Sequence, residues 1–416
     1  MADRPFVAVL TTLDSKPEAA RFVCDALADA GASPWLVDLS LRPHSHDFAD
    51  VAAAALAQAS GTSWDALAQL SRAEAAEKMT IGAIEAVRNR LEAGALDGIL
   101  GLGGANGSTM ACGVMRALPL GLPKIMVTPV AATAAVQWYV AESDVAMFPT
   151  IGDISLNRVT RTAIAKAARA MGGMVQAAQP WRTQEENRAG PSLIGVSSFG
   201  NTQPAVDRIT SQLVAEGFEV IHFHASGPGG RALESVAEQG ELAAVIDLTT
   251  SELADFVTGG VYSAGGTRLT GAGAAGIPQV VVPGCLDFTN WWVGQVPDRY
   301  AQREFYQYNV EILLMRTNAE EAEELGELVG ARLAEARGPV RVLIPGEGWS
   351  QLSGRETFDL AGREIGTWTQ PDVDQVFLDA LRRHLSAEVI SDLPLHINAP
   401  EFADLCVDSV ISLIGG

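Results

Sequence analysis

The chain of 416 residues suggests two or three domains, at roughly 150 residues for each. Hydrophobic residues make up 48% of it and charged residues 19%, a balance typical of globular proteins rather than of disordered chains. The net charge of −21 argues against a nucleic-acid partner and against docking on an anionic membrane, because both require a basic face. A small anionic ligand remains compatible with this charge.

The sequence carries no pattern typical of export or membrane insertion. The apolar run that follows MADRP is too short for a signal peptide, and no stretch approaches the roughly 18 apolar residues of a spanning helix. The four cysteines, Cys24, Cys112, Cys285 and Cys406, lie far apart and form no CxxC pair, which is typical of reduced thiols. We therefore expect a cytoplasmic protein.

Short apolar runs alternate with longer helical segments along the first half. Strands are predicted, in chain order, at residues 6–10, 35–39, 98–102 and 124–128. A helix over residues 17–30 would end at Gly31, and residues 48–94 are predicted to be an alanine-rich helical insert of two helices. Strands and helices that alternate at this spacing pair in parallel through right-handed crossovers.

The two halves of the chain repeat one pattern of predicted strands and helices. VAVLTTLDSKPEAARF, from Val7, matches in pattern IGVSSFGNTQPAVDRI, from Ile194, and GALDGILGLGGANGS parallels GELAAVIDLTTSELA. We predict an α/β fold with two Rossmann-like parallel-sheet units from an internal duplication, residues 1–180 and 193–416, joined by a linker at 179–192. In such sheets ligands bind beyond the carboxyl ends of the strands, so a ligand cleft is expected between the two units.

The segment GLGGANGST follows the third strand and leads into a helix. Its glycines let the backbone approach a ligand, and the N–H groups at the helix start can hold phosphate oxygens. It is neither the dinucleotide fingerprint, because Asn106 stands at the third glycine position, nor a Walker A loop, because no Gly-Lys-Ser/Thr follows. We predict phosphate or nucleotide binding, with a simple strand-to-helix turn as the alternative. The predicted binding residues are Gly103, Gly104, Asn106, Gly107, Ser108 and Thr109.

The loop after the first strand, TTLDSK, lies on the same edge of the predicted sheet. Its hydroxyl and charged groups extend the predicted nucleotide site, as does the end of the fourth strand. These added residues are Thr11, Thr12, Asp14, Lys16 and Thr128. The alternative for this loop is helix capping by Ser15 with Glu18, and both functions can hold together.

Strand ends in the second half offer groups for acid/base chemistry. His224 ends a strand ahead of the turn SGPGGR, in which Arg231 could pair with a carboxylate or phosphate. Asp247 ends the next strand, Glu252 follows it, and Asp287 follows the fourth strand. We predict catalytic roles for His224, Arg231, Asp247 and Glu252, with helix capping or core positions as the alternative. No ligand set with metal-binding spacing is evident, so no metal site is predicted.

These motifs, together with LPLGLPKIMVTPVA, AMFPTIGDISLNRVTR, LTTSELADFVTGGV and LLMRTNAEE, resemble the family of the tomato mosaic virus resistance protein over nearly the whole chain. The resemblance implies two Rossmann-like subdomains, of which the N-terminal one binds ATP. It places the glycine loop and TTLDSK on the nucleotide side, and the motifs around His224, Arg231 and Glu252 in the second half. The family tends to have Gly-Thr-Ala-Asp-Thr-Lys where this chain has Thr-Thr-Leu-Asp-Ser-Lys.

We therefore expect an ATP-binding protein that uses Mg²⁺ as a charge partner and contacts a small anionic organic substrate in the cleft. Two alternatives remain open. One is an ATP-independent hydrolase or lyase of small-molecule metabolism, with His224 as the base, and the other is a non-catalytic regulatory binding module. The sequence leaves open whether the protein is an enzyme. A homodimer or higher homo-oligomer is expected, because symmetric homo-oligomers are the commonest assemblies.

Overall fold

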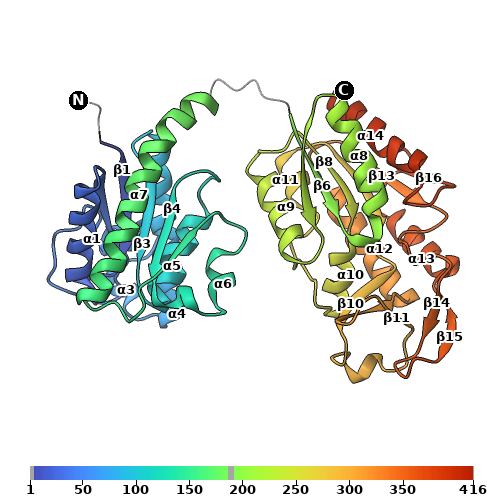
Figure 1. Ribbon diagram of the computed structural model, residues 1–416, viewed down its shortest axis with the longest axis horizontal. Helices are drawn as coiled ribbons and strands as arrows, with labels where there is room; N and C mark the ends of the chain where they lie inside the picture. The colour runs from blue at the N-terminus through green and yellow to red at the C-terminus, as the bar shows by residue number, and fades with distance from the viewer. Residues whose placement is uncertain (1–3, 186–191, 416) are drawn as a thin grey trace. The chain divides into compact units, whose positions relative to one another are not determined.

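The computed structural model describes residues 4–185 and 192–415 (Figure 1). The chain divides into two compact units, Met1–Ala189 and Gly190–Gly416. The first part of the predicted linker is helical, because α7 (Arg158–Glu185) runs into it, and residues 186–191 lie outside the described residues. Among the described helices, none combines the length and apolarity that crossing a membrane requires.

The N-terminal unit is built on one parallel sheet with the strand order β2-β1-β3-β4-β5. Its strands are β1 (Phe6–Thr11), β2 (Ser33–Asp38), β3 (Gly98–Leu102), β4 (Lys124–Thr128) and β5 (Ala146–Pro149). The four predicted strands of this half are confirmed, and β5 is added at the edge. The strand order reverses at β1, because β2 and β3 pair with its opposite sides. In open parallel sheets, ligands bind at such a reversal.

Helices cover both faces of this sheet, because its strands are apolar on both sides. They are α1 (Pro17–Asp29), α2 (Ala53–Ala59), α3 (Trp64–Leu67), α4 (Arg72–Glu92), α5 (Ala105–Arg116), α6 (Val136–Val140) and α7. Ala8 and Leu10 share a core with α2, α4 and α5, whereas Val7 and Val9 share a core with α1 and α7. Alternate residues of β1 thus point to opposite faces, as the period of a strand requires.

The helical insert contains three helices, α2, α3 and α4, where the sequence predicts two. Residues 48–52 are not helical, because Val51 pairs with Val37 in an isolated bridge beside β2. Ser71 and Glu74 form a capping box that fixes the start of α4. Arg72 is thereby placed as the first residue of this helix.

The C-terminal unit repeats the strand order of the first. Its parallel sheet runs β16-β13-β9-β8-β6-β7, so that β7-β6-β8-β9-β13 repeats β2-β1-β3-β4-β5 and β16 is added at an edge. The strands are β6 (Leu193–Ser198), β7 (Glu219–His224), β8 (Ala244–Thr249), β9 (Gln279–Gly284), β13 (Val340–Pro345) and β16 (Ile390–Leu393). The predicted α/β fold with two Rossmann-like sheets is confirmed, and the ligand cleft expected between the units stays a prediction.

This second sheet is also covered on both faces. Its helices are α8 (Gln203–Ala215), α9 (Pro228–Glu238), α10 (Ser251–Thr258), α11 (Gly271–Ala275), α12 (Ala319–Ala334), α13 (Pro371–Leu381) and α14 (Pro400–Gly415). One core joins the sheet to α8 and α14 through residues such as Val196 and Phe402. Another joins it to α10, α12 and α13 through residues such as Val281 and Phe377.

The C-terminal unit also contains an antiparallel sheet that the sequence analysis missed. Its strand order is β10-β12-β11-β14-β15. The strands are β10 (Phe288–Trp292), β11 (Phe305–Gln307), β12 (Ile312–Arg316), β14 (Glu356–Phe358) and β15 (Glu364–Thr367). Phe288, Leu314 and Trp368 belong to its buried core. The strands are too short to show a clear apolar period, and they come from segments far apart in the chain.

Candidate functional site

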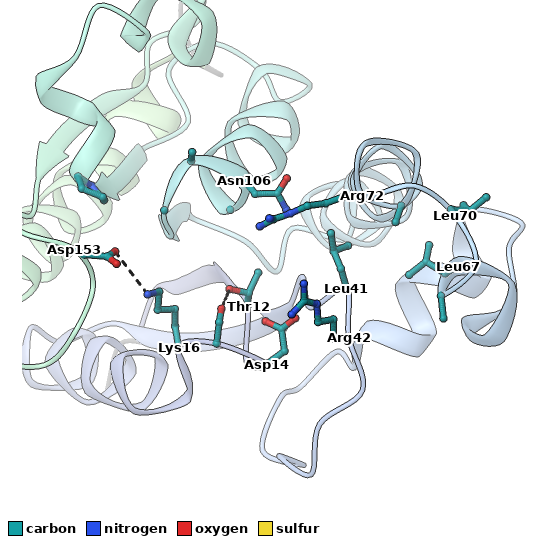
Figure 2. Close-up of a pocket in the computed structure, with 17 residues that line it drawn as sticks. Thr12, Asp14, Lys16, Leu41, Arg42, Leu67, Leu70, Arg72, Asn106 and Asp153 are labelled. Atoms are coloured by element: carbon teal, nitrogen blue, oxygen red, sulfur yellow. Dashed lines mark hydrogen bonds and ion pairs between the residues drawn. The ribbon is translucent and has the colours of Figure 1, made fainter.

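A pocket of about 750 Å³ opens at the carboxyl edge of the sheet in the N-terminal unit (Figure 2). Its walls come from the loops that follow the strands of this sheet and from the helical insert. Polar groups that line it include Thr12, Asp14, Lys16, Arg42, Arg72 and Asn106, and apolar groups include Leu41, Leu67 and Leu70. This volume lies within the range of roughly 300–1,000 Å³ that is usual for small-molecule sites.

Asp38, at the end of β2, holds the first two loops of the pocket together. Its Oδ1 accepts hydrogen bonds from the backbone N–H of Leu13 (3.1 Å) and from Ser40 Oγ (2.5 Å). Its Oδ2 lies 2.8 Å from His44 Nε2. The backbone N–H of Asp14 in turn donates to Ser40 Oγ (2.9 Å). These bonds fix the backbone at Asp14, whose carboxylate has no partner among the described residues.

The glycine loop between β3 and α5 packs closely against its own helix. A Cβ atom on Gly103 would lie 2.9 Å from the Cα of Gly107, so this close approach requires glycine. Gly104 is the N-cap of α5, and a Cβ atom there would meet nothing within 4 Å. Ser108 Oγ donates to Thr128 Oγ1 (2.8 Å), which ties the loop to the end of β4.

The start of α5 leaves backbone donors unpaired at this pocket. The N–H of Ser108 donates to the carbonyl oxygen of Gly104 (2.8 Å). The described residues supply no acceptor for the N–H groups of the four residues from Gly104 to Gly107. Free N–H groups at a helix start, together with the helix dipole, favour the binding of anions.

Three basic side chains line the same pocket. Lys16 Nζ lies 3.7 Å from Asp153 Oδ1, and the side chain of this aspartate is 80% exposed. Arg42 and Arg72 are exposed, and the described residues supply neither of them with a hydrogen-bond or ion-pair partner. Against these three cations, the pocket wall contains the carboxylates of Asp14 and Asp153. The pocket is therefore locally positive in a chain whose net charge is −21.

The structure brings part of the predicted nucleotide site to this pocket and places the rest around it. Thr12, Asp14, Lys16, Gly104, Asn106 and Gly107 line it. Thr11, Gly103, Ser108 and Thr128 are buried. Thr109 is exposed, and its hydroxyl donates to the carbonyl oxygen of Ala105 (3.1 Å) within α5. The role of these residues in nucleotide binding stays a prediction.

Sequence reasoning missed Arg42 and Arg72. Arg42 follows β2, which pairs in parallel with β1, so the predicted parallel pairing carries the signal that would place Arg42 at this edge. Arg72 belongs to the insert, and no local pattern indicates where the insert packs.

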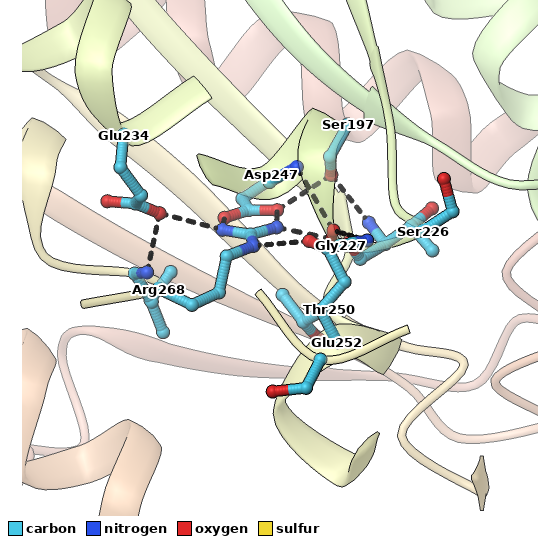
Figure 3. A network of polar contacts seen from close by, with 12 residues as sticks. Ser197, Ser226, Gly227, Glu234, Asp247, Thr250, Glu252 and Arg268 are labelled. Atoms are coloured by element: carbon cyan, nitrogen blue, oxygen red, sulfur yellow. Dashed lines mark hydrogen bonds and ion pairs between the residues drawn. The ribbon is translucent and has the colours of Figure 1, made fainter. Parts of the chain in front are cut away.

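In the C-terminal unit, a fully buried guanidinium binds three carboxylates (Figure 3). Arg268 donates to both oxygens of Asp247 (2.5 and 2.6 Å), to Glu252 (2.7 Å) and to Glu234 (3.0 Å). Burial opposes its charged form, but the carboxylates, Asp247 foremost, raise the pKa of Arg268 well above its usual value. Burial raises the pKa of Glu252 in spite of its bond to Arg268.

The carboxylates of this network also occupy helix starts. Glu252 accepts hydrogen bonds from the N–H groups of Gly227 (2.6 Å) and Gly230 (3.0 Å) at the start of α9. Glu234 accepts one from the N–H of Gly271 (2.5 Å) at the start of α11. A Cβ atom on Gly230 would lie 1.9 Å from Glu252 Oε2, so this approach requires glycine. In this unit, carboxylates of the chain itself thus accept hydrogen bonds from N–H groups at helix starts, whereas the N–H groups at the start of α5 have no acceptor in the described chain.

The predicted catalytic residues of the second half do not form one accessible group. Asp247 and Glu252 are brought together, but they are 2% and 0% exposed and both bind Arg268, an arrangement that favours a structural role. Arg231 lies in the first turn of α9 and is half-buried. The catalytic roles of these residues stay predictions.

His224 is exposed at the end of β7. Its Nδ1 lies 3.0 Å from Ser226 Oγ, and its ring packs on Phe199 with the ring centroids 5.3 Å apart. Partial burial lowers the pKa of His224, so its imidazole is neutral at neutral pH. Across the described ranges, no contact joins His224 to Asp247 or Glu252, and no group of three or more His, Cys, Asp and Glu residues could hold a metal ion.

Two domains of one protein family match nearly the whole chain. The N-terminal domain of the uncharacterised protein family UPF0261 matches residues 5–180, and its C-terminal domain matches residues 191–414. A UPF0261 protein of Mesorhizobium japonicum is 37% identical over 95% of this chain and 96% of its own length. One of Rhizobium meliloti is 36% identical over 96% of both chains. The ToMV resistance protein Tm-1(GCR237) of Solanum lycopersicum is 32% identical over 76% of this chain and 42% of its own length.

Proposed function

The chain belongs to the uncharacterised protein family UPF0261, and we propose that its N-terminal unit binds ATP in the pocket at the carboxyl edge of its sheet. One observation carries the proposal. The unpaired N–H groups at the start of α5 and the side chains of Lys16, Arg42 and Arg72 all belong to the wall of this single pocket.

The phosphates of ATP match this set of donors. Backbone N–H groups at a helix start bind phosphate oxygens without a basic side chain, as the glycine loop allows. Arg42 and Arg72 add guanidinium groups, which bind phosphate through two parallel hydrogen bonds. Both are without partners in the described chain, so binding a phosphate would break no existing ion pair.

The remaining wall of the pocket suits the rest of the ligand. Leu41, Leu67 and Leu70 provide apolar surface against which a base and ribose could pack. The free carboxylate of Asp14 would hold the Mg²⁺ ion that accompanies the phosphates, because Mg²⁺ in such sites binds one or two carboxylates together with phosphate oxygens. Three parts of the pocket wall thus support ATP as the ligand. The N–H and basic groups suit the phosphates, the leucines suit the base and ribose, and Asp14 suits Mg²⁺.

A second candidate function is acid/base catalysis on a small anionic ligand in the C-terminal unit. The exposed and neutral imidazole of His224 supports it, because a neutral imidazole can accept a proton near pH 7. Under this second candidate, the protein would be an ATP-independent hydrolase or lyase with His224 as the base. A regulatory binding module would show no turnover with either ligand.

The proposal is tested by isothermal titration of ATP with Mg²⁺ into the full chain and into Gly104→Val. A Cβ atom at Gly104 meets nothing within 4 Å and the φ of Gly104 is negative, so valine adds bulk at a residue that lines the pocket without a clash inside the protein. Gly173→Val is the matched control, because Gly173 is exposed on α7 and a Cβ atom there also meets nothing within 4 Å.

ATP is expected to bind the wild type and Gly173→Val with equal affinity and Gly104→Val with an affinity at least tenfold lower. Equal binding to all three proteins would place ATP outside this pocket. No binding to the wild type would remove the proposal altogether.

A further inference from the structure

Two neighbouring pockets lie at the carboxyl ends of β13 and β16 in the C-terminal unit, next to α13. The outer pocket has a volume of about 480 Å³ and the inner one of about 90 Å³. Both are lined by Gly346, Glu347, Trp349, Pro371 and Asp374, so they lie side by side and share a wall, and together they are called the cavity below. Neither belongs to the ATP pocket of the N-terminal unit or to the Arg268 network.

Asp287 lines the inner pocket, and one of its carboxylate oxygens is buried and receives no hydrogen bond from the described residues. Asp287 is 4% exposed, and its Oδ2 accepts hydrogen bonds from Ser350 Oγ (2.7 Å) and Trp368 Nε1 (2.7 Å). Its Oδ1 is left without a hydrogen-bond donor by residues 4–185 and 192–415. A buried polar oxygen is costly unless a donor reaches it, so this atom indicates a missing donor in the inner pocket.

The nearby guanidinium does not supply this donor. Arg316 donates to Asp374 Oδ1 (2.8 Å) and to the backbone carbonyl oxygens of Trp368 (2.9 Å) and Asp287 (3.3 Å). These bonds direct it to Asp374 and the backbone rather than to the Asp287 carboxylate.

The pocket walls carry an excess of negative charge. Asp287, Asp374 and Glu347 line the inner pocket against the single positive charge of Arg316. Glu347 is exposed and has no ion-pair partner in the described chain. Burial raises the pKa of Asp374, and the charge of Asp287 raises it further, while Arg316 opposes both. Asp392 of the outer pocket adds nothing to this excess, because it pairs with Arg382 (2.6 Å), which also lines that pocket.

We propose that this cavity binds an organic ammonium ion, with the ammonium group in the inner pocket as the donor to Asp287 Oδ1 and the carbon body in the outer pocket. Asp287 and Glu347 balance its charge, because Asp374 already pairs with Arg316 (2.8 Å). Ile344, Trp349, Leu378 and Leu393 line the outer pocket and give the carbon body an apolar surface. A metal ion does not fit as well, because the described residues contain no metal-binding group of three ligands and a metal leaves the outer pocket unused.

Three probes of similar shape and different charge test this site on the full chain. They are 2-phenylethylamine, which is a cation at pH 7, the neutral 2-phenylethanol and the anion 3-phenylpropionate. Binding is measured by isothermal titration and by the fluorescence of the tryptophans, because Trp349 and Trp368 line the cavity. The amine is expected to bind at millimolar concentration, the alcohol at least tenfold more weakly and the anion not at all.

Two variants locate the bound amine. Asp287→Asn and Glu347→Gln each remove one negative charge from the inner pocket and are expected to weaken the binding of 2-phenylethylamine, Asp287→Asn by at least tenfold. Asp372→Asn is the matched control on α13, since Asp372 is exposed and does not line the cavity. If Asp287→Asn does not fold, the Glu347→Gln variant and the comparison of the three probes still test the proposal, because Glu347 is exposed.

The proposal is overturned if the amine does not bind, if the alcohol binds as tightly as the amine, or if Glu347→Gln and Asp372→Asn bind the amine with equal affinity. None of these results affects the ATP proposal, which concerns the other unit.

Discussion

Arg268 and Asp247 form a two-point ion pair whose side chains are 0% and 2% exposed. In the repeated segments, Asp247 stands where the first half has Gly101, and Glu252 stands where it has Asn106. The second half therefore places carboxylates at a sheet edge where the first half has small or neutral residues. These carboxylates bind Arg268 and the backbone within the C-terminal unit, whereas the corresponding edge of the N-terminal unit is open to a ligand.

Arg268→Met is expected to destabilise the C-terminal unit by about 3–5 kcal/mol, because it leaves buried carboxylates without their counter-charge. Urea unfolding followed by tryptophan fluorescence measures this change. Arg363→Met is the control, since Arg363 pairs with Asp359 at the surface and its side chain is 80% exposed. An exposed pair contributes about 0–1 kcal/mol, so the control should unfold near the wild-type urea concentration. Equal unfolding midpoints for the two variants would contradict a supporting role of the Arg268 network.

Asp255 predicts a pH dependence of stability. It is fully buried on α10, and its oxygens accept hydrogen bonds from the N–H of Tyr262 (3.0 Å) and from Asn290 Nδ2 (2.8 Å). Burial raises the pKa of Asp255 from 3.8 to about 7. Between these two pH values the folded protein keeps a proton that the unfolded chain releases, so the free energy of unfolding falls as the pH rises.

Comparing the wild type with Asp255→Asn isolates the contribution of Asp255 to the pH dependence of stability. Between pH 4 and about 7, the wild type is expected to lose up to about 4 kcal/mol of stability relative to the variant, which has no proton to release. Urea unfolding at several pH values measures the difference. Parallel pH profiles for the two proteins would show that the buried aspartate keeps its ordinary pKa.

The two arginines of the N-terminal pocket lead to a prediction about ATP affinity. Arg42→Gln and Arg72→Gln should each weaken ATP binding by about tenfold or more, because a hydrogen bond to a charged group contributes about 1.5–3 kcal/mol. Arg169→Gln should bind ATP as the wild type does, since Arg169 is exposed on α7 and outside the pocket. Isothermal titration at low and high salt measures all three. Wild-type affinity in both pocket variants would show that the arginines do not contact the phosphates.

The strands and the glycine loop of the N-terminal unit could be predicted because each depends on a local pattern. An apolar run predicts β3, and the glycines after it predict a close turn into α5. Gly103 packs closely against Gly107, since a Cβ atom on Gly103 would lie 2.9 Å from the Cα of Gly107. The edge of the sheet then follows from the parallel topology, which is why Asp14, Lys16 and Asn106 line one pocket.

The rest of the site depends on contacts between distant segments. Arg268 stands outside regular secondary structure, and its partners Glu234, Asp247 and Glu252 lie on three other elements. No local pattern in the sequence indicates that Arg268 pairs with these carboxylates. The sequence therefore predicts Asp247 and Glu252 as candidate catalytic acids. Arg72 was missed for the same reason, because its place in the pocket depends on how the insert packs against the sheet.

His224→Ala separates the two candidate functions. His224 lies in the C-terminal unit, so its loss should leave the affinity of the N-terminal pocket for ATP unchanged. If the second unit carries out acid/base chemistry with this imidazole, turnover of its substrate should fall by about 10²–10⁴-fold. Titration with ATP and a turnover assay on a panel of small carboxylates measure the two effects. If His224→Ala turns over a substrate from that panel as fast as the wild type does, His224 has no catalytic role in that reaction.

The proposed place for the phosphates of ATP is the start of α5 in the N-terminal unit. A crystal structure of the full chain with ATP and Mg²⁺ tests it most directly. We predict electron density for the phosphates within hydrogen-bond distance of the N–H groups of Gly104–Gly107, with Arg42 and Arg72 turned toward them. Nucleotide density at any other place, with this pocket filled by water, would contradict the account.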